Sequence, residues 1–258
     1  MAFAKDFNDF VRPGICVSSS FVTIAGALIA HAPMFYVFAS AIVSLLSCAA
    51  VYSFNNITDS EEDRKNGRLI SPFVVKKWSG VTLALLFALL AVACAILTVP
   101  AALLISVMFI VTGVAYSIFR IKKYILLKNI YTAFLISLSF LLGMGFYAPG
   151  AAFYFFVIYS TIFVGSVISD MRDVEGDRGS GIRTVPVAIG IMKTKYLVAA
   201  LIIITTAAMM VDARRLFVFS LFAFASLLLI IKNDFARAHK IGMSSFLFFD
   251  IWMALAMF

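Results

Sequence analysis

Two short stretches of the 258-residue chain concentrate acidic side chains at regular spacing, and together they hold eight of its 13 aspartates and glutamates. These are Asp59, Glu61, Glu62 and Asp63 in the first stretch and Asp170, Asp173, Glu175 and Asp177 in the second. In a helix, residues 55, 59 and 63 share one face, and so do residues 170, 173 and 177. The sequence therefore predicts two walls of oxygen ligands, the first of which includes the amide of Asn55.

Carboxylates gathered this closely repel one another unless cations lie between them. Oxygen ligands without histidine or cysteine partners favour Mg²⁺ over zinc. Mg²⁺ held by a few carboxylates usually takes its remaining ligands from water and phosphate oxygens. Basic residues stand close to both stretches in the sequence. The chemistry indicated is therefore the binding of a phosphate or diphosphate through magnesium.

The elements that must position these acids are membrane helices, because the composition excludes a soluble protein. The chain is 63% hydrophobic and 13% charged, with a mean hydropathy of +1.05, whereas soluble domains are about 45–50% apolar and about 25% charged. A cytosolic globular enzyme, a secreted disulfide scaffold and a disordered chain are excluded. Cys16, Cys48 and Cys94 lie in apolar stretches without metal-ligand spacing, so we interpret them as small buried hydrophobic residues.

Nine apolar stretches approach the length of a membrane-spanning helix, which needs about 20 residues. They run roughly over Ile15–His31, Met34–Asn55, Trp78–Thr98, Ala101–Phe119, Asn129–Tyr147, Ala151–Asp170, Tyr196–Val211, Leu216–Lys232 and Met243–Phe258. These runs are longer than the about 10-residue alternating segments of a membrane barrel. We predict an all-α polytopic membrane protein with a single transmembrane domain over residues 1–258.

The basic residues predict the orientation of this bundle. If the amino terminus is cytoplasmic, 19 of the 21 lysines and arginines fall in inner segments, and only Arg214 and Arg215 fall outside. This bias places the amino terminus and both acidic loops in the cytoplasm. Acidic residues contribute little to orientation, so their clustering needs another cause. A cleaved signal peptide is disfavoured because Asp6 and Asp9 stand in its positive region, and an uncleaved first helix is expected.

Three other interpretations stay open at this point. The acidic stretches could be solvated loops that keep helix ends at the surface, although their helical spacing and shared side of the membrane disfavour this. A transporter would place its ionisable groups near the midplane, whereas these acids lie at one membrane edge. Asp250 does lie midway along the last span, where an acid is functional by default or has a local hydrogen-bonding partner.

The motifs resemble those of a known family. Asn55–Asp63 (NNITDSEED) resembles the first aspartate-rich motif of the UbiA superfamily of intramembrane prenyltransferases, NDxxDxxxD, and residues 170–186 (DMRDVEGDRGSGIRTVP) resemble the second, DxxDxxGDxxxGxxTxP. The resemblance covers nearly the whole chain. Four shorter segments resemble the archaeal branch of the family that makes digeranylgeranylglyceryl phosphate. They are Arg12-Pro13 with Cys16, Leu28-Ile29-Ala30, Lys122-Lys123-Tyr124 with Asn129, and Lys240-Ile241-Gly242-Met243.

The sequence departs from the family pattern at three places. Asn56 stands where the family usually has aspartate, so the first motif has one charge fewer. The segment Asn66–Ser71 is shorter than the family's RPIPSG segment and leaves Arg68 as its basic residue. The family's YxxxK appears as Tyr116 followed by Arg120, and arginine keeps the charge and offers a bidentate fork to phosphate.

The resemblance implies roles for the residues of both motifs. Asn55, Asp59 and Asp63 are assigned to one Mg²⁺, and Asp173 and Asp177, supported by Asp170, to another. Substrate contacts are assigned to Arg68, Tyr116, Arg120, Lys122, Lys123 and Asn129.

The implied activity is Mg²⁺-dependent transfer of a prenyl group, here geranylgeranyl, from an allylic diphosphate to a lipid acceptor in ether-lipid biosynthesis. Geranylgeranylglyceryl phosphate is the acceptor that the resemblance favours. The first alternative is an aromatic acceptor, as in quinone or haem pathways. The second is a terpene cyclase, which needs no acceptor. The expected partners are the prenyl diphosphate, the acceptor and membrane lipids, with no nucleic acid and no obligate protein partner.

Overall fold

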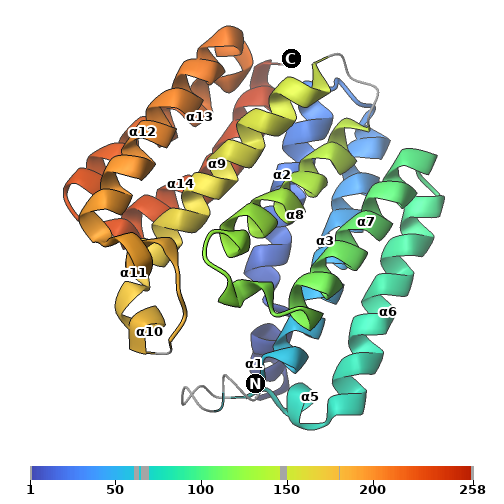
Figure 1. The fold of residues 1–258 in the computed structure, drawn as a ribbon. Coiled ribbons are helices and arrows are strands. Elements are labelled where there is room, and N and C mark those ends of the chain that lie inside the picture. Colours follow the sequence, from blue (N-terminus) through green and yellow to red (C-terminus); the bar gives the residue numbers. More distant parts are fainter. Residues whose placement is uncertain (1, 61–63, 65–69, 146–149, 180, 257–258) are drawn as a thin grey trace. The chain divides into compact units, whose positions relative to one another are not determined.

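The computed structural model describes residues 2–60, 64, 70–145, 150–179 and 181–256, and every regular element in these ranges is a helix (Figure 1). The prediction of an all-α protein is confirmed for this part of the chain. In chain order the elements are α1 (Ala2–Val11), α2 (Pro13–Ile29), α3 (Met34–Thr58), α5 (Pro72–Val75), α6 (Lys77–Ile96), α7 (Pro100–Ile118), η1 (Ile121–Lys123), α8 (Leu127–Met144), α9 (Ala151–Arg172), α10 (Val174–Gly179), α11 (Val185–Ile189), α12 (Ile191–Met209), η2 (Met210–Asp212), α13 (Ala213–Ile231) and α14 (Phe235–Ala256).

Each of the nine predicted spans corresponds to one of these helices. Seven helices are long and apolar enough to cross a membrane by length and composition, namely α3, α6, α7, α8, α9, α12 with η2, and α13. Of the other two, α2 is a shorter apolar helix of 17 residues and α14 has 22 residues, including several charged ones. The chain is therefore an integral membrane protein.

Several helices extend beyond the predicted apolar stretches. α12 begins at Ile191 rather than at Tyr196, α14 begins at Phe235 rather than at Met243, and α3 ends at Thr58 rather than at Asn55. The added turns carry polar or charged side chains, which do not interrupt a helix once it leaves the hydrocarbon. Long basic side chains there bury their stems and keep their charged ends in water.

The described helices fall into two compact units. The first unit comprises Met1–Arg120 and Leu138–Tyr147, and the second comprises Ile121–Ser137 and Ala148–Phe258. The first therefore holds the first acidic motif and the second unit holds the second. Helix α8 contributes its first half to the second unit and its last turns to the first unit.

Small residues hold the helices of the first unit close together. A Cβ atom added to Gly26 of α2 would lie 2.2 Å from the carbonyl oxygen of Phe140, and one added to Gly143 of α8 would lie 1.8 Å from that of Thr23. The Ser19 hydroxyl lies 2.9 Å from the Ser44 hydroxyl. Close approach through small and hydroxyl-bearing residues is typical of helix packing in membranes, where lipid offers no hydrophobic driving force.

Apolar and aromatic residues form the core of the second unit. A buried cluster joins α9, α11, α12, α13 and α14 through Ile168, Met171, Val185, Ile202 and Ile230, among others. Phe219 of α13 stacks on Phe249 of α14, with ring centroids 4.5 Å apart. A polar contact joins the first turn of α9 to the start of α13. The hydroxyl of Tyr154 in α9 donates to Asp212, and Arg215 in α13 donates to the same hydroxyl at 2.7 Å.

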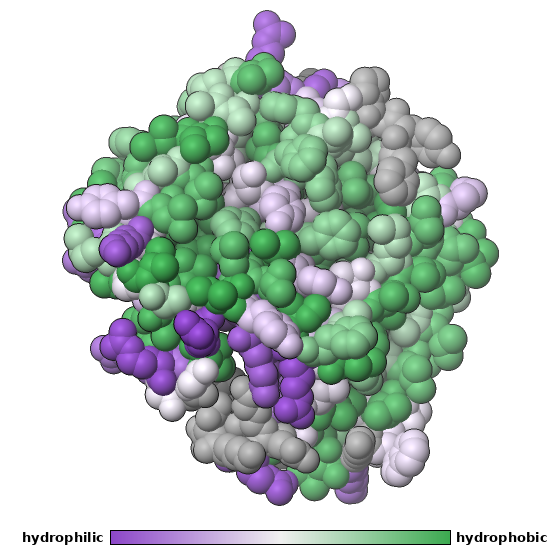
Figure 2. Space-filling view, in the orientation of Figure 1, coloured by the Kyte–Doolittle hydropathy of each residue, from purple (hydrophilic) through white to green (hydrophobic). Residues whose placement is uncertain are grey.

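The helices expose large apolar side chains, as lipid-facing helices do. Only 22% of the apolar stretch of α6 is buried, and Leu85 and Leu89 are 58% and 68% exposed. Figure 2 shows apolar residues over most of the visible surface, with hydrophilic residues gathered in small areas. An exposed apolar surface of this kind fits lipid and would be insoluble in water.

Candidate active site

The first acidic motif lies at the end of α3. Asn55 occupies the last turn of this helix, and Asp59 is the residue that ends it, with φ −86°. Two hydrogen bonds hold the pair: Ser117 of α7 donates to Asn55 Oδ1 at 3.0 Å, and Asn55 Nδ2 donates to Asp59 Oδ2 at 3.1 Å. Both of these hydrogen bonds join residues of the first unit. Asp63 and Arg68, the other residues assigned to this motif, lie outside the described residues.

The neighbouring Asn56 contacts a different helix. It is 7% exposed, and its Nδ2 donates to the backbone oxygens of Phe10 at 2.6 Å and Asp9 at 3.3 Å, at the end of α1. An ionised carboxylate cannot donate to a carbonyl oxygen. The departure of this position from the family's aspartate therefore has a structural reason, since the residue acts as a donor here.

The second acidic motif interrupts a helix. α9 ends at Arg172, Asp173 caps it with φ −98°, and α10 begins at Val174. The predicted continuous helical face is therefore wrong for Asp173 and Asp177, which lie at and beyond the break.

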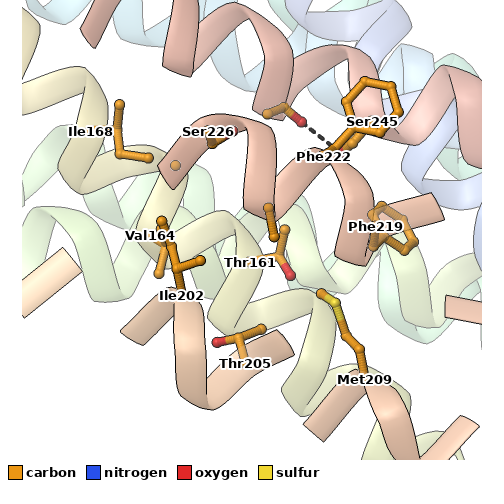
Figure 3. Close-up of a pocket in the computed structure, with 13 residues that line it drawn as sticks. Thr161, Val164, Ile168, Ile202, Thr205, Met209, Phe219, Phe222, Ser226 and Ser245 are labelled. Carbon is orange, nitrogen blue, oxygen red and sulfur yellow. Dashed lines mark hydrogen bonds between the residues drawn. The ribbon is translucent and has the colours of Figure 1, made fainter. Parts of the chain in front are cut away.

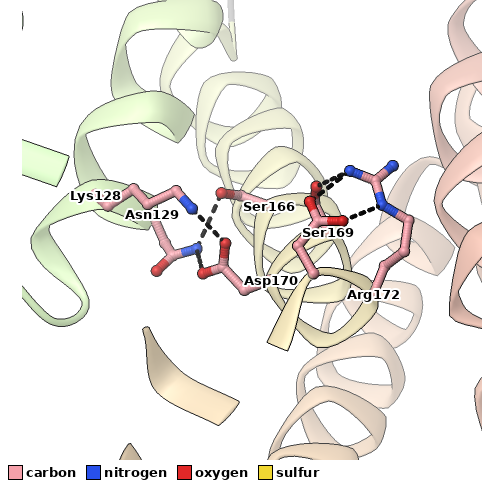
Figure 4. Close-up of polar contacts among 7 residues, drawn as sticks. Lys128, Asn129, Ser166, Ser169, Asp170 and Arg172 are labelled. Carbon is pink, nitrogen blue, oxygen red and sulfur yellow. Dashed lines mark hydrogen bonds and ion pairs between the residues drawn. The ribbon is translucent and has the colours of Figure 1, made fainter. Parts of the chain in front are cut away.

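Asp170 lies at the centre of a buried polar network (Figure 4). It is 1% exposed; Lys128 Nζ lies 2.6 Å from its Oδ1, and Asn129 Nδ2 donates to its Oδ2 at 2.9 Å. Asn129 Nδ2 also donates to the Ser166 hydroxyl at 3.0 Å. Both oxygens of Asp170 are therefore engaged by α8, and α8 and α9 are joined at the level of the motif.

Asp173 forms a bidentate ion pair with the residue before it. Arg172 donates from Nε to Oδ1 at 2.7 Å and from Nη2 to Oδ2 at 2.6 Å (Figure 4). These hydrogen bonds hold the pKa of the Asp173 carboxyl below its usual value. A cation that binds Asp173 must therefore displace the guanidinium or share the carboxylate with it.

The pKa of the Asp177 carboxyl is shifted in the opposite direction to that of Asp173. Burial, the largest cause, raises the pKa of its carboxyl and Asp170 raises it further, while Lys128 and the nearby Thr184 hydroxyl lower it. Among the described residues, its Oδ2 is buried without a hydrogen-bond partner, and so are the hydroxyl of nearby Thr184 and Asn129 Oδ1. Buried polar atoms without partners are rare in folded proteins and call for an explanation such as a ligand or ion.

Each motif by itself offers ligands that fit magnesium. Asn55 and Asp59 in the first unit, and Asp173 and Asp177 in the second, supply amide and carboxylate oxygens, which Mg²⁺ prefers, and Asp177 Oδ2 has no hydrogen-bond partner among the described residues. Within the described ranges, no three His, Cys, Asp or Glu side chains come together as a metal cluster. Mg²⁺ on these residues would therefore need water or phosphate oxygens to complete its coordination, as expected for a diphosphate complex.

The predicted substrate-binding residues occupy two short regions. Tyr116 lies in the last turns of α7, and Arg120, just after that helix, is exposed with a left-handed φ of 49°. Lys122, partly buried, and Lys123, exposed, form most of η1. Asn129 is buried in the network around Asp170, away from solvent.

Sequence reasoning missed three residues of this site. Lys128 pairs with Asp170, Ser117 holds Asn55, and Thr184 lies beside Asp177. The pairing of Lys128 could have been predicted from sequence, because a lysine in the first turn of a helix opposes the helix dipole and so needs an acidic partner. Nothing in the sequence around Ser117 indicates its contact with Asn55.

The second unit also contains an open apolar pocket, with about 450 Å³ of empty space when the space at its mouth is included (Figure 3). From α9 it is lined by Thr161, Val164, Gly165 and Ile168, whereas Ser166 and Asp170 leave the same helix on another face. The remaining lining residues come from α12, α13 and α14, including Phe219, Phe222 and Gly242. A Cβ atom added at Gly165 or Gly242 would meet no atom within 4 Å.

The fold and these motifs define an integral membrane enzyme with acidic sites suited to Mg²⁺ and phosphate. Comparison with known proteins supplies the class: the model of the UbiA prenyltransferase family matches residues 19–254, and the chain belongs to this family. It is 27% identical over 207 residues to a digeranylgeranylglyceryl phosphate synthase of Methanothermobacter thermautotrophicus, covering 78% of this chain and 72% of that protein.

Solved structures show the same fold. A UbiA homolog from Aeropyrum pernix K1 in its apo form superposes with a TM-score of 0.81 at 17% identity, over 96% of this chain and 100% of that one. A UbiA homolog from Archaeoglobus fulgidus bound to GPP and Mg²⁺ gives 0.71 at 14% identity, over 95% and 99%. The enzyme class predicted from the motifs, a membrane prenyltransferase, is confirmed.

Proposed function

We propose that this enzyme transfers a geranylgeranyl group from its allylic diphosphate to geranylgeranylglyceryl phosphate. The observation that carries the diphosphate chemistry is the set of buried oxygens on Asp177, Thr184 and Asn129, which have no hydrogen-bond partner in the described part of the chain and lie beside the Lys128–Asp170 pair. These acceptor atoms need a cation or a donor, and Lys128, which lies close enough to lower the pKa of Asp177, already pairs with Asp170. A diphosphate with bound Mg²⁺ meets this need.

In this proposal Asn55, Asp59 and Asp63 hold one Mg²⁺, and Asp173 and Asp177 hold another. Asp170 keeps Lys128 and Asn129 in place, because both of its oxygens already bind them. When bound, Mg²⁺ neutralises the charge that develops on the departing diphosphate. The A. fulgidus homolog, solved with GPP and Mg²⁺, supports this part of the proposal.

The side chains of the enzyme complete the stabilisation of the leaving group. When the allylic C–O bond breaks, its electron pair stays on the diphosphate, and preorganised cations favour that state. Lys128, Arg120, Lys122 and Lys123 are the basic residues assigned to this anion or to the phosphate of the acceptor, and Arg68 joins them from its place in the sequence. Water has to be kept from the carbocation, which it would otherwise capture as prenol.

The acceptor assignment is supported by the relative from M. thermautotrophicus and by the number of basic residues. A glyceryl phosphate brings a second anion into the site and needs cations beyond those that offset the leaving group. An aromatic acid needs fewer, and a cyclase needs none for an acceptor. The excess of cytoplasmic charge predicted from sequence also supports an active site on the cytoplasmic side, with the amino terminus on that side.

The identity of the product tests this proposal directly. Purified enzyme with Mg²⁺ and geranylgeranyl diphosphate is offered geranylgeranylglyceryl phosphate, an aromatic acid or no acceptor, and the lipid products are identified by mass spectrometry. We expect digeranylgeranylglyceryl phosphate and free diphosphate from the first reaction only. An aromatic product alone, or a cyclised hydrocarbon without an acceptor, would overturn the assignment of the acceptor.

Two substitutions separate the site from the fold. Asp59→Ala and Asp173→Ala should abolish diphosphate release while the protein stays folded in detergent, and chelation should do the same until Mg²⁺ is restored. Asp212→Asn is the matched control, since Asp212 binds Tyr154 and Arg215 where α9 begins, at the opposite end of that helix from the second motif. Full activity in both motif variants would falsify the two-motif metal site.

A further inference from the structure

The end of α1 needs hydrogen-bond donors that the following backbone does not supply. The helix ends at Val11, Arg12 turns the chain with a left-handed φ of 54°, and Pro13, which has no N–H, begins α2. The Arg12 amide donates to Asn8. The last carbonyls of a helix have no partner within it, and here Asn56 Nδ2 donates to those of Asp9 and Phe10.

A second attachment reaches α1 from the chain beyond the first acidic motif. The Ser71 hydroxyl donates to the backbone oxygen of Asp6 at 2.9 Å. Phe10, which is fully buried, stacks on Phe73 of α5 with ring centroids 5.4 Å apart, and Phe7 meets the same ring edge-on at 6.4 Å. α1 is therefore bound both by Asn56, the second residue of the motif, and by the segment that follows the motif.

The last turn of α3 carries two asparagines that are held in different directions. Asn55 is held by Ser117 of α7, and Asn56 is held by the end of α1. Successive residues of a helix point about 100° apart, so two fixed neighbours prevent the turn from rotating about its axis. The direction in which Asn55 and Asp59 present their oxygens is thereby set.

We infer that Asn56 is a positioning residue that, through its bonds to α1, sets the last turn of α3 for metal binding. The inference rests on the proposed function, because it concerns the residues assigned there to Mg²⁺. It gives α1 a part in the site although no residue of α1 is assigned to the substrate. It also gives residue 56 a role that aspartate could not fill, since a carboxylate facing two carbonyl oxygens would be repelled.

The test compares Asn56→Asp, Asn56→Ala and Ser71→Ala with Ser106→Ala. Ser106 bonds Ser47 at 2.9 Å in the same unit, so its removal controls for the loss of a buried hydroxyl. Binding of Mg²⁺ with inorganic diphosphate is measured by calorimetry, and hydrogen exchange of residues 2–11 by mass spectrometry. Loss of a residue that orients metal ligands costs about 10–100-fold in affinity.

We expect Asn56→Asp and Asn56→Ala to weaken Mg²⁺ binding by about tenfold or more and to speed exchange in α1. Ser71→Ala should speed that exchange as well and weaken Mg²⁺ binding less, and Ser106→Ala should change neither. If the Asn56 variants fail to fold, Ser71→Ala decides alone. Tighter Mg²⁺ binding by Asn56→Asp, or unchanged binding with unchanged α1 exchange, would overturn the inference.

Asp59→Asn distinguishes this failure from failure of the proposed function. If Asp59→Asn abolishes Mg²⁺ binding while the Asn56 and Ser71 variants bind normally, only the positioning role of Asn56 is wrong. If Asp59→Asn also binds normally, the metal assignment itself is wrong, and the inference falls with it.

Discussion

Lys128 and Asp170 form the shortest described link between α8 and the second acidic motif, with Nζ 2.6 Å from Oδ1. The carboxylate is almost fully buried, with 2% of its side chain exposed, and the lysine is 29% exposed. Asn129 takes the other carboxylate oxygen. The first aspartate of the motif therefore binds protein groups on both sides, which separates its role from that of Asp177.

Breaking this pair should destabilise the protein. Removing one partner of a buried ion pair costs about 3–5 kcal/mol, and the partial exposure of Lys128 places the expected cost at the lower end. Asp170→Asn and Lys128→Met should each lower the unfolding temperature in detergent, and the double variant should lose less than the two losses added together. Strictly additive losses in this double-mutant cycle would show that the two side chains do not interact.

Asp177→Asn should stabilise the metal-free protein while it abolishes activity. Burial raises the pKa of the Asp177 carboxyl in the folded state. The stabilisation from its protonated form is therefore complete below the unfolded value of about 3.9 and is lost as the pH rises through the higher folded value. At neutral pH the ionised carboxylate thus destabilises the fold, and the neutral amide does not.

Thermal unfolding at pH 7 in a chelator checks this prediction. Asp177→Asn should unfold at a higher temperature than the unchanged protein, and added Mg²⁺ should stabilise the unchanged protein but not the variant. An equal response of both proteins to Mg²⁺ would remove Asp177 from the metal site.

Two glycine substitutions should change stability in opposite directions. Gly242→Ala should stabilise by up to about 1 kcal/mol, because alanine favours helix over glycine by that amount and its Cβ finds open space in the pocket. Gly143→Ala should destabilise, because its Cβ would lie 1.8 Å from the Thr23 oxygen. Both are measured by thermal unfolding in one detergent, and a shared direction of change would contradict the described packing.

Loss of the basic residues near η1 should affect the acceptor more than the prenyl diphosphate. A hydrogen bond to a charged group contributes about 1.5–3 kcal/mol, or roughly ten- to a hundredfold in binding. Lys122→Ala and Arg120→Ala should raise the acceptor KM by that factor and divert some carbocation to free prenol. Equal rises in both KM values would assign these residues to the diphosphate. Unchanged kinetics would show that their charges serve only to orient the chain in the membrane.

The predicted orientation requires Lys123 and Arg178 on the cytoplasmic side and Arg214 on the opposite side. Single cysteines at these positions, in oriented vesicles, should react with an impermeant thiol reagent from opposite sides, measured above the background from the three native cysteines. Labelling of Arg178→Cys and Arg214→Cys from the same side would contradict the nine-span topology.

The membrane helices could be predicted from sequence because hydrocarbon demands long apolar runs, and both motifs could be found because their acids stand apart in an apolar chain. The direction of individual side chains could not be predicted. Asn56 and Asp59 belong to one motif, yet one binds the end of α1 and the other is held by Asn55. That difference depends on contacts between segments distant in sequence, such as the 46 residues between Asn56 and Phe10.

The break at Asp173 shows the same limit. The sequence spacing fits a continuous helix, and nothing local requires its end at Arg172. The bidentate pairing of Arg172 with Asp173 and the partly buried Asp177 accompany the break, and neither feature can be read from the spacing of the acids.

The serine contacts of α2 also order the events of biosynthesis. Ser19 bonds Ser44, 25 residues later in the chain, at 2.9 Å and Ser139, 120 residues later, at 2.7 Å. At about 5–20 residues per second, Ser139 leaves the ribosome roughly 5–20 s after Ser44. Ser44 can thus pair with the Ser19 hydroxyl in lipid while the chain is still being made. The Ser19 hydroxyl of the nascent α2–α3 hairpin can therefore be hydrogen-bonded in the membrane before α8 is synthesised.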